Sequence, residues 1–138
     1  HICFYAKNEK IIFTGDTLFS LGCGRVFEGT YLEMLTSLKL IKKLPLDTQI
    51  YCGHEYTQKN LDFCIKYEVN NERLIEKKKW IISRLSQKEA TIPITVEEEL
   101  KTNIFLRCDN SEVKKSLEMG DSTELEVFKK LRDLKDVF

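Results

Sequence analysis

The stretch I-I-F-T-G-D-T-L-F-S-L-G-C-G-R-V-F-E-G-T, residues 11–30, decides how this chain folds. It opens with the apolar run Ile11 to Phe13, which ends abruptly at Asp16, a pattern typical of a buried strand that delivers a carboxylate to its C-terminal end. Two glycines then bracket Cys23. We name residues 22–29 the glycine loop. Because loops held this way usually face a ligand, we expect a binding site beside Asp16.

The elements on either side of this stretch continue an α/β pattern. Apolar runs at residues 2–6 and 11–13, separated by a polar turn, predict a hairpin. After the glycine loop, Thr30 and Glu33 have the spacing of a capping box, so a helix should begin there and end before Pro45. Its expected buried positions, spaced by three and four, are Tyr31, Met34, Leu35, Leu38 and Ile41.

A second strand end carries a second side chain that can bind metal. Residues 48–52 predict a short strand that runs into Gly53 and His54, which repeats the arrangement at Asp16. Each side chain alone is more often a turn or cap residue than a ligand. A catalytic metal, however, needs ligands from different strands that converge at one sheet edge. From the pattern alone, a metal site and a pair of structural turn residues both remain open.

From Thr57 onward the pattern changes to successive helices without a convincing strand. Helices are expected at residues 57–67, 71–85, a short segment that opens with the capping box at Thr95, 111–118 and 123–135, with irregular backbone at 102–107. The chain therefore predicts an α+β fold. Its domain boundary should lie near Tyr56, with residues 1–55 forming the α/β part and residues 56–138 an all-helical part.

Composition and charge narrow the function classes. Hydrophobic residues make up 42% and charged residues 32%, which is typical of a globular protein rather than a disordered one. The formal net charge is zero, so the overall balance favours neither nucleic acid nor an anionic membrane as a partner. Five cysteines without a C-x-x-C pair, and no apolar run long enough for a membrane span, predict reduced thiols and a cytoplasmic protein.

Several short motifs together resemble one enzyme family. The phrases, in chain order, are T-G-D-T-L-F, G-C-G-R, F-E-G-T, Y-C-G-H-E-Y-T, N-I-F-L-R and L-R-D-L-K-D. In this order and spacing they closely resemble glyoxalase II, hydroxyacylglutathione hydrolase, of the metallo-β-lactamase superfamily. The T-G-D motif alone would indicate only the superfamily, whereas the motifs of the helical tail make the narrower resemblance specific.

The resemblance implies a fold and a reaction. The chain would be the C-terminal part of a metallo-β-lactamase αβ/βα sandwich, followed by a glyoxalase II-type helical domain that binds substrate. Two divalent metal ions, zinc first and iron or manganese as alternatives, would supply a hydroxide that attacks the thioester of S-D-lactoylglutathione. The products would be glutathione and D-lactate.

The resemblance also assigns roles to individual residues. Asp16 resembles the carboxylate that bridges the metals, and His54 resembles the last histidine ligand. Glutathione would be bound by residues of the loop, the turn and the last helix, namely Arg25, Phe27, Tyr56, Arg132 and Lys135. Phe27 stands where many members carry a tyrosine, so one polar contact to glutathione should be missing. Ile104 replaces the usual proline of the N-P-F-L-R motif.

The largest departure concerns the other metal ligands. The family's H-x-H-x-D-H cluster and the ligand histidine of its H-T-x-G-H motif are not in this chain, and His1 matches the non-ligand histidine of the latter. One carboxylate and one imidazole cannot hold a two-metal centre, so we expect these 138 residues alone to bind metal weakly and to be inactive. The chain thus looks like a fragment, whose N-terminal half either adjoins it or comes from a separate chain.

Two alternatives remain open. The chain could be a non-catalytic remnant that keeps only the helical module on the glutathione side. A more distant alternative is another hydrolase of the superfamily or a persulfide dioxygenase, against which the helical tail argues. In every case the expected partner is a small molecule rather than nucleic acid or a membrane.

Overall fold

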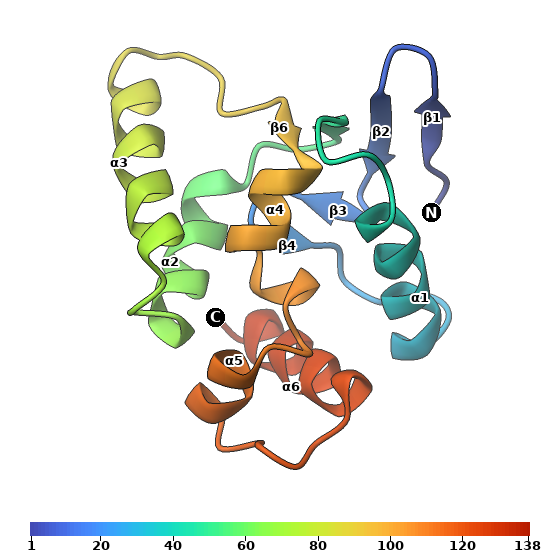
Figure 1. The fold of residues 1–138 in the computed structure, drawn as a ribbon, viewed down its shortest axis with the longest axis vertical. Helices are drawn as coiled ribbons and strands as arrows, with labels where there is room; N and C mark the ends of the chain where they lie inside the picture. The colour runs from blue at the N-terminus through green and yellow to red at the C-terminus, as the bar shows by residue number, and fades with distance from the viewer.

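A four-stranded sheet with the order β1-β2-β5-β6 forms the α/β part of the computed structural model, which describes residues 1–138 (Figure 1). The strands β1 (Phe4–Ala6) and β2 (Ile11–Gly15) pair antiparallel, which confirms the predicted hairpin. Strand β5 (Gln49–Cys52) pairs parallel with β2. Because parallel neighbours end at the same sheet edge, Gly15 and Cys52 lie side by side.

Helix α1 (Tyr31–Lys42) makes the crossover between the parallel strands β2 and β5. It begins as predicted, with the Thr30 hydroxyl accepting from the Glu33 N–H at 3.2 Å and the Glu33 carboxylate accepting from the Thr30 N–H at 2.7 Å. Its buried residues are Met34, Leu35, Leu38 and Ile41. These side chains join Ile12 of β2 and Ile50 of β5 in the main hydrophobic core.

The remainder of the chain is mostly helical and lies below and beside the sheet (Figure 1). Its helices are α2 (Thr57–Tyr67), α3 (Glu72–Ser86), α4 (Val96–Thr102), the 3₁₀ turn η1 (Ile104–Leu106), α5 (Ser111–Ser116) and α6 (Glu124–Asp136). Capping boxes at Thr95 and Thr123 open α4 and α6. None of these helices has the length and apolar character needed to cross a membrane.

Two local predictions for the helical part are wrong. Residues Ile94–Thr95 form strand β6, which pairs antiparallel with β5, although no strand was expected after Thr57. A segment of two residues is too short to show the alternation of apolar and polar residues that marks a strand. The pairing therefore becomes visible only in the structure, where these residues lie along the edge of β5. The segment expected to be irregular contains η1, because the Asn103 side chain accepts from the Phe105 N–H at 3.0 Å and caps a 3₁₀ turn.

One core joins the two parts of the chain. It is a cluster of 24 buried side chains that includes Leu18 and Leu38 from the first part and Phe63, Phe105 and Phe128 from the second. At the surface, the Tyr31 hydroxyl of α1 bonds the Asp133 carboxylate of α6 at 2.5 Å. The division at residues 55 and 56 stays a prediction.

The outer face of the β1–β2 hairpin is apolar and exposed. Burial alternates along β2, so Ile12 and Thr14 are buried, whereas Phe13 is 51% exposed rather than part of a fully buried strand. Phe4 and Ile2, at 68% and 75% exposed, enlarge this apolar surface. The reason is that α1 covers only one face of these strands. Side chains of a strand point alternately to its two faces, so those on the uncovered face, Ile2, Phe4 and Phe13, form an exposed apolar stripe.

We predict that the isolated 138-residue chain self-associates through this stripe, because a contiguous exposed apolar patch beside the edge strand β1 favours association. The double variant Phe4→Lys, Phe13→Lys should shift the chain towards monomer in sedimentation analysis. The matched control Ile82→Lys changes a similarly exposed residue on α3 and should not. An unmodified chain that remains monomeric and melts cooperatively would contradict this prediction.

Candidate active site

Asp16 and His54 converge at the C-terminal edge of the parallel pair β2 and β5. The Gly53 N–H donates to the Gly15 carbonyl at 2.8 Å, which ties the two strand ends together. As a result, the His54 Nε2 lies 3.6 Å from an Asp16 carboxylate oxygen. Both side chains are about half exposed, at 52% and 50%, so they remain accessible to a ligand.

Two glycines make room for the Asp16 residue. A Cβ added at Gly53 would lie 2.7 Å from the Asp16 carboxylate oxygen and 3.2 Å from the Gly15 carbonyl oxygen. A Cβ added at Gly24 would lie 1.9 Å from the Asp16 carbonyl oxygen. Gly15 itself has a φ of +50°, a left-handed conformation that turns the chain sharply at the end of β2. The glycines of both motifs therefore shape the position of one carboxylate.

We predict that Gly53→Ala weakens metal binding in the natural full-length polypeptide by about 10- to 100-fold, the usual cost of disturbing groups that orient a metal ligand. The added methyl group must displace the Asp16 side chain, because the two atoms would lie only 2.7 Å apart. Competition with a metal-binding dye measures the affinity. The control Gly120→Ala adds a methyl group where nothing lies within 4 Å. Equal affinities for Gly53→Ala and the unchanged protein would contradict the prediction.

A cleft of about 430 Å³ opens beside this pair and gathers the other predicted site residues. Asp16, Arg25, Phe27, Tyr56, Arg132 and Lys135 all line it. They come from the end of β2, where Asp16 follows Gly15, from the glycine loop, from the residue before α2 and from the last helix α6. The fold thus brings the predicted residues of both parts of the chain to one place.

Aromatic rings form one side of the cleft. The His54 ring stacks on the Tyr56 ring, with centroids 5.1 Å apart and an interplanar angle of 17°. The Phe19 ring meets Tyr56 edge-on at 5.1 Å. Phe27 is 80% exposed on the glycine loop and has no polar atom to offer a ligand. These rings orient the imidazole and leave the Tyr56 side chain 49% exposed.

The three cationic side chains predicted from the motifs line the cleft, and their settings differ. Arg25 is exposed, with its Nε 3.7 Å from an Asp136 carboxylate oxygen. Arg132 is buried; its guanidinium donates to the Cys23 carbonyl at 2.7 Å and to Asp136 at 2.8 Å, so it anchors the chain before Arg25. Burial lowers the pKa of Lys135 to about 8, and the nearby charges of Lys59 and Arg132 act in the same direction.

The structure adds cleft residues that the sequence motifs did not indicate. Phe19, Lys59 and Asn60 line the cleft, and so does His1. Lys59 and Asn60 follow Tyr56 by three and four residues, so the helical spacing of α2 places them on the same face. That spacing was the available signal for both residues. No comparable signal exists for Phe19, because its position depends on the β3–β4 hairpin (Leu18–Phe19 and Gly22–Cys23).

The Asp16 and His54 pair fits two positions in the coordination shell of a divalent ion. Zinc ligands of these types lie about 2.1 Å from the metal, so two ligand atoms of one ion can be at most about 4.2 Å apart. The observed 3.6 Å separation satisfies this limit. Within residues 1–138, no group of three or more His, Cys, Asp or Glu side chains is arranged to hold a metal ion. A divalent ion held by Asp16 and His54 would therefore need further ligands.

Comparison with known proteins agrees with this geometry. A family model described as hydroxyacylglutathione hydrolase C-terminus matches residues 55–138, and a metallo-beta-lactamase superfamily model matches residues 1–54. The hydroxyacylglutathione hydrolase of Pelagibacter ubique (strain HTCC1062) is 54% identical over 138 residues, which are 100% of this chain and 52% of that protein. That of Bartonella tribocorum is 44% identical over 137 residues, 99% of this chain and 54% of that protein.

The chain spans about half the length of the curated relatives it matches. The resemblance inferred from the motifs and the α+β fold class are both confirmed by these matches. Membership of this superfamily indicates divalent metals. Because one family model covers more than half of the residues, the chain belongs to the hydroxyacylglutathione hydrolase family.

Proposed function

We propose that the natural full-length polypeptide containing this chain hydrolyses the thioester S-D-lactoylglutathione to glutathione and D-lactate. The observation that carries this proposal is the convergence of Asp16 and His54, 3.6 Å apart, beside a cleft with cationic walls that Asp16 itself lines. A thioester of glutathione carries carboxylates on its γ-glutamyl and glycine residues and an electrophilic carbonyl on its central cysteine sulfur. The cationic walls of the cleft suit the carboxylates, and the pair Asp16 and His54 suits the carbonyl.

Asp16 and His54 would hold divalent ions, with two zinc ions as the first candidate and iron or manganese as alternatives. Such ions lower the pKa of a bound water towards neutrality and polarise a carbonyl oxygen. Asp16 would offer both of its carboxylate oxygens to the ions. His54 is oriented for this role by stacking on Tyr56. Neither residue would have to act as a general base, because the ions themselves would lower the pKa of the attacking water.

The other cleft residues would bind and orient glutathione. Arg25 and Lys135 offer charge-assisted hydrogen bonds to its carboxylates, and Arg25 can pair with a carboxylate through two parallel N–H groups. Tyr56, which is half-exposed and stacks on the imidazole, offers its hydroxyl. Arg132 contributes positive charge and holds the loop that carries Arg25.

The proposal also covers the cellular compartment of the enzyme and the origin of its remaining metal ligands. The five free cysteines suit a reducing compartment, and we propose a cytoplasmic enzyme. The remaining metal ligands would belong to an N-terminal half that either precedes this chain or is a separate partner.

A thioesterase assay tests the function. The natural full-length polypeptide should release glutathione from S-D-lactoylglutathione without consuming oxygen, which separates hydrolysis from persulfide dioxygenase chemistry. The 138-residue chain with added zinc should show no turnover above buffer. Turnover by the short chain that disappears in Asp16→Ala would overturn the requirement for further ligands. A full-length polypeptide without thioesterase activity would overturn the proposed function.

We predict that glutathione binding weakens as the pH rises through about 8, because Lys135 loses its charge above its lowered pKa. Burial of this amine disfavours its charged form and lowers its pKa, although the Phe63 and Phe138 rings, with centroids 5.2 Å and 5.1 Å away, attract the cation. Calorimetry with S-methylglutathione and the full-length polypeptide measures the effect. In Lys135→Arg the fall should disappear, since the guanidinium stays charged. An equal fall in both proteins would exclude Lys135 as its source.

A further inference from the structure

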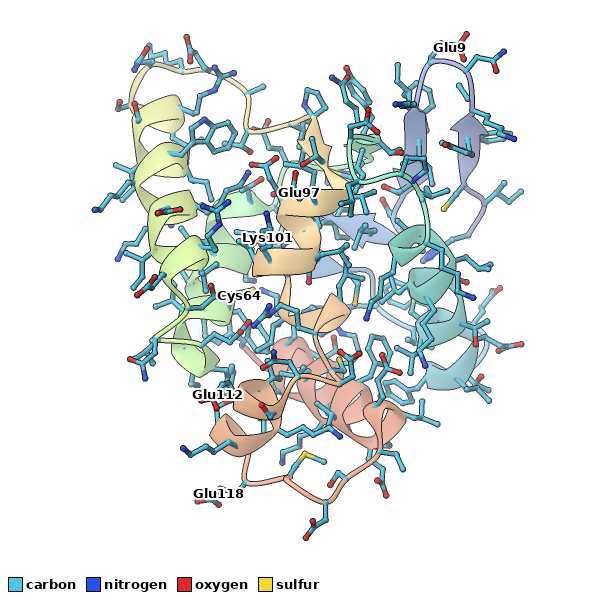
Figure 2. All side chains as sticks on the ribbon, in the orientation of Figure 1. Glu9, Cys64, Glu97, Lys101, Glu112 and Glu118 are labelled. Carbon is cyan, nitrogen blue, oxygen red and sulfur yellow. The ribbon has the colours of Figure 1, made fainter.

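The main chain of the β3–β4 hairpin is held by side chains of the helical part. Six consecutive carbonyls, from Phe19 to Gly24, each lie within hydrogen-bonding distance of a donor from residues 57–138. The donors are Asn103 to Phe19 at 3.4 Å and to Gly22 at 3.1 Å, Asn60 to Ser20 at 3.0 Å, Cys64 to Leu21 at 3.2 Å, and Arg132 to Cys23 at 2.7 Å and to Gly24 at 3.4 Å. Cys64 lies inside the molecule, on α2 (Figure 2).

A buried carboxylate completes this arrangement at the hairpin turn. Leu21 has a φ of +60°, an uncommon conformation for a residue with a branched side chain. Its N–H points at the Glu99 carboxylate, 3.0 Å and 3.2 Å from the two oxygens. The Asn103 amide also donates to Glu99, at 2.7 Å. Glu99 is fully buried, which is costly for a carboxylate unless donors surround it.

The hairpin connects this buried network to the cleft. Phe19, at one end, packs edge-on against Tyr56 and lies 6.2 Å from the His54 ring. At the other end, Gly24 lies against the Asp16 carbonyl, since a Cβ added to Gly24 would be 1.9 Å from the carbonyl oxygen. The next residue in the chain is Arg25. A shift of the hairpin along its own axis would therefore move an aromatic wall and a cationic wall of the cleft together.

We propose that Asn60, Glu99 and Asn103 are positioning residues of the active site, which fix the β3–β4 hairpin by its main chain and so set the places of Phe19 and Arg25. Apolar packing alone would not do this. Leu18 and Leu21 are fully buried, but hydrophobic contacts have no direction, whereas hydrogen bonds weaken steeply when misaligned. This proposal rests on the proposed function only in the measurement of KM, because amide exchange does not depend on the substrate.

Hydrogen exchange and kinetics of the full-length polypeptide test this proposal. Asn103→Leu and Asn60→Leu keep the number and branching of the side-chain heavy atoms but remove the donors to the hairpin. One lost buried hydrogen bond is worth about 1.4 kcal/mol, so amides of residues 18–25 should exchange about tenfold faster. KM for S-D-lactoylglutathione should rise by a similar factor, with a smaller change in kcat. Glu99→Gln retains an acceptor for Leu21 and should show a smaller effect than Glu99→Leu.

The control Asn70→Ala changes an exposed asparagine on the loop after α2 and should alter neither exchange nor KM. A lowered melting temperature in the leucine variants, with unchanged exchange at residues 18–25 and unchanged KM, would overturn the proposal and leave a purely structural role. If Asn103→Leu does not fold, the exchange rates of Asn60→Leu decide, because Asn60 also lines the cleft and a change in KM alone would not separate positioning from substrate contact. If the full-length polypeptide has no thioesterase activity, the exchange rates of residues 18–25 still test the positioning role. Failure of the proposed function and failure of this proposal therefore give different results.

Discussion

Asp16→Asn in the natural full-length polypeptide is expected to lower both metal affinity and thioesterase turnover by at least about a hundredfold. Removing a residue that merely orients a metal ligand already costs about 10- to 100-fold. Asp16 is itself a proposed ligand, and asparagine removes its charge while keeping its volume. Its amide could also donate to the His54 Nε2, which lies 3.6 Å from the present carboxylate oxygen and is the atom proposed to bind metal.

Elemental analysis of the purified protein gives the metal content, and the thioester assay gives the turnover. Asp121→Asn is the matched control, because this aspartate is exposed in the turn before α6 and lies outside the cleft. Circular dichroism should show the same fold for both variants. Full metal content and turnover in Asp16→Asn would remove Asp16 from the proposed centre.

Gly24→Ala should destabilise the folded protein by about 3 kcal/mol or more, at the upper end of the range for overpacking. The added Cβ would meet the Asp16 carbonyl oxygen at 1.9 Å, and neither partner can move freely. Arg132 holds the carbonyls of Cys23 and Gly24, while Asp16 follows directly on the strand β2. Relief of the clash must therefore break ordered contacts on one side or the other.

The melting temperature and the denaturant midpoint of the full-length polypeptide measure this loss. Gly120→Ala is the control for a glycine-to-alanine change as such, since nothing lies within 4 Å of its added Cβ. It should be neutral or stabilising by about 0.4–1 kcal/mol, because alanine restricts the unfolded chain. Equal stabilities of the two variants would show that the glycine loop can shift freely, contrary to the contacts of Arg132.

Elements with strong local signals could be predicted from the sequence. The capping boxes at Thr30, Thr95 and Thr123 set the starts of three helices, and each is present with both reciprocal hydrogen bonds. The apolar runs of β1 and β2 indicated strands, but the assumption of full burial failed at Phe13. Strand β6 could not be predicted, because its two residues acquire strand structure only by pairing with β5.

The order and direction of the strands explain which part of the candidate site could be predicted. Asp16 and His54 each follow a strand, and parallel neighbouring strands end at the same edge, so their convergence follows from the order of elements. The contribution of Lys59 to the cleft follows from the helical spacing after Tyr56. By contrast, nothing in the local sequence shows that Asn60, Glu99 and Asn103 hold the hairpin, since their partners are 40 to 84 residues away.

The sequence by itself determined the helix starts, the strand ends that carry Asp16 and His54, and the family, because each of these is written in neighbouring residues or in motifs. Only the tertiary structure decided which side chains support them. It showed Arg132 as an anchor of the glycine loop and Glu99 as a buried acceptor at the Leu21 turn. The physical reason is that hydrogen bonds between distant segments depend on distance and angle, which exist only once the core has brought those segments together.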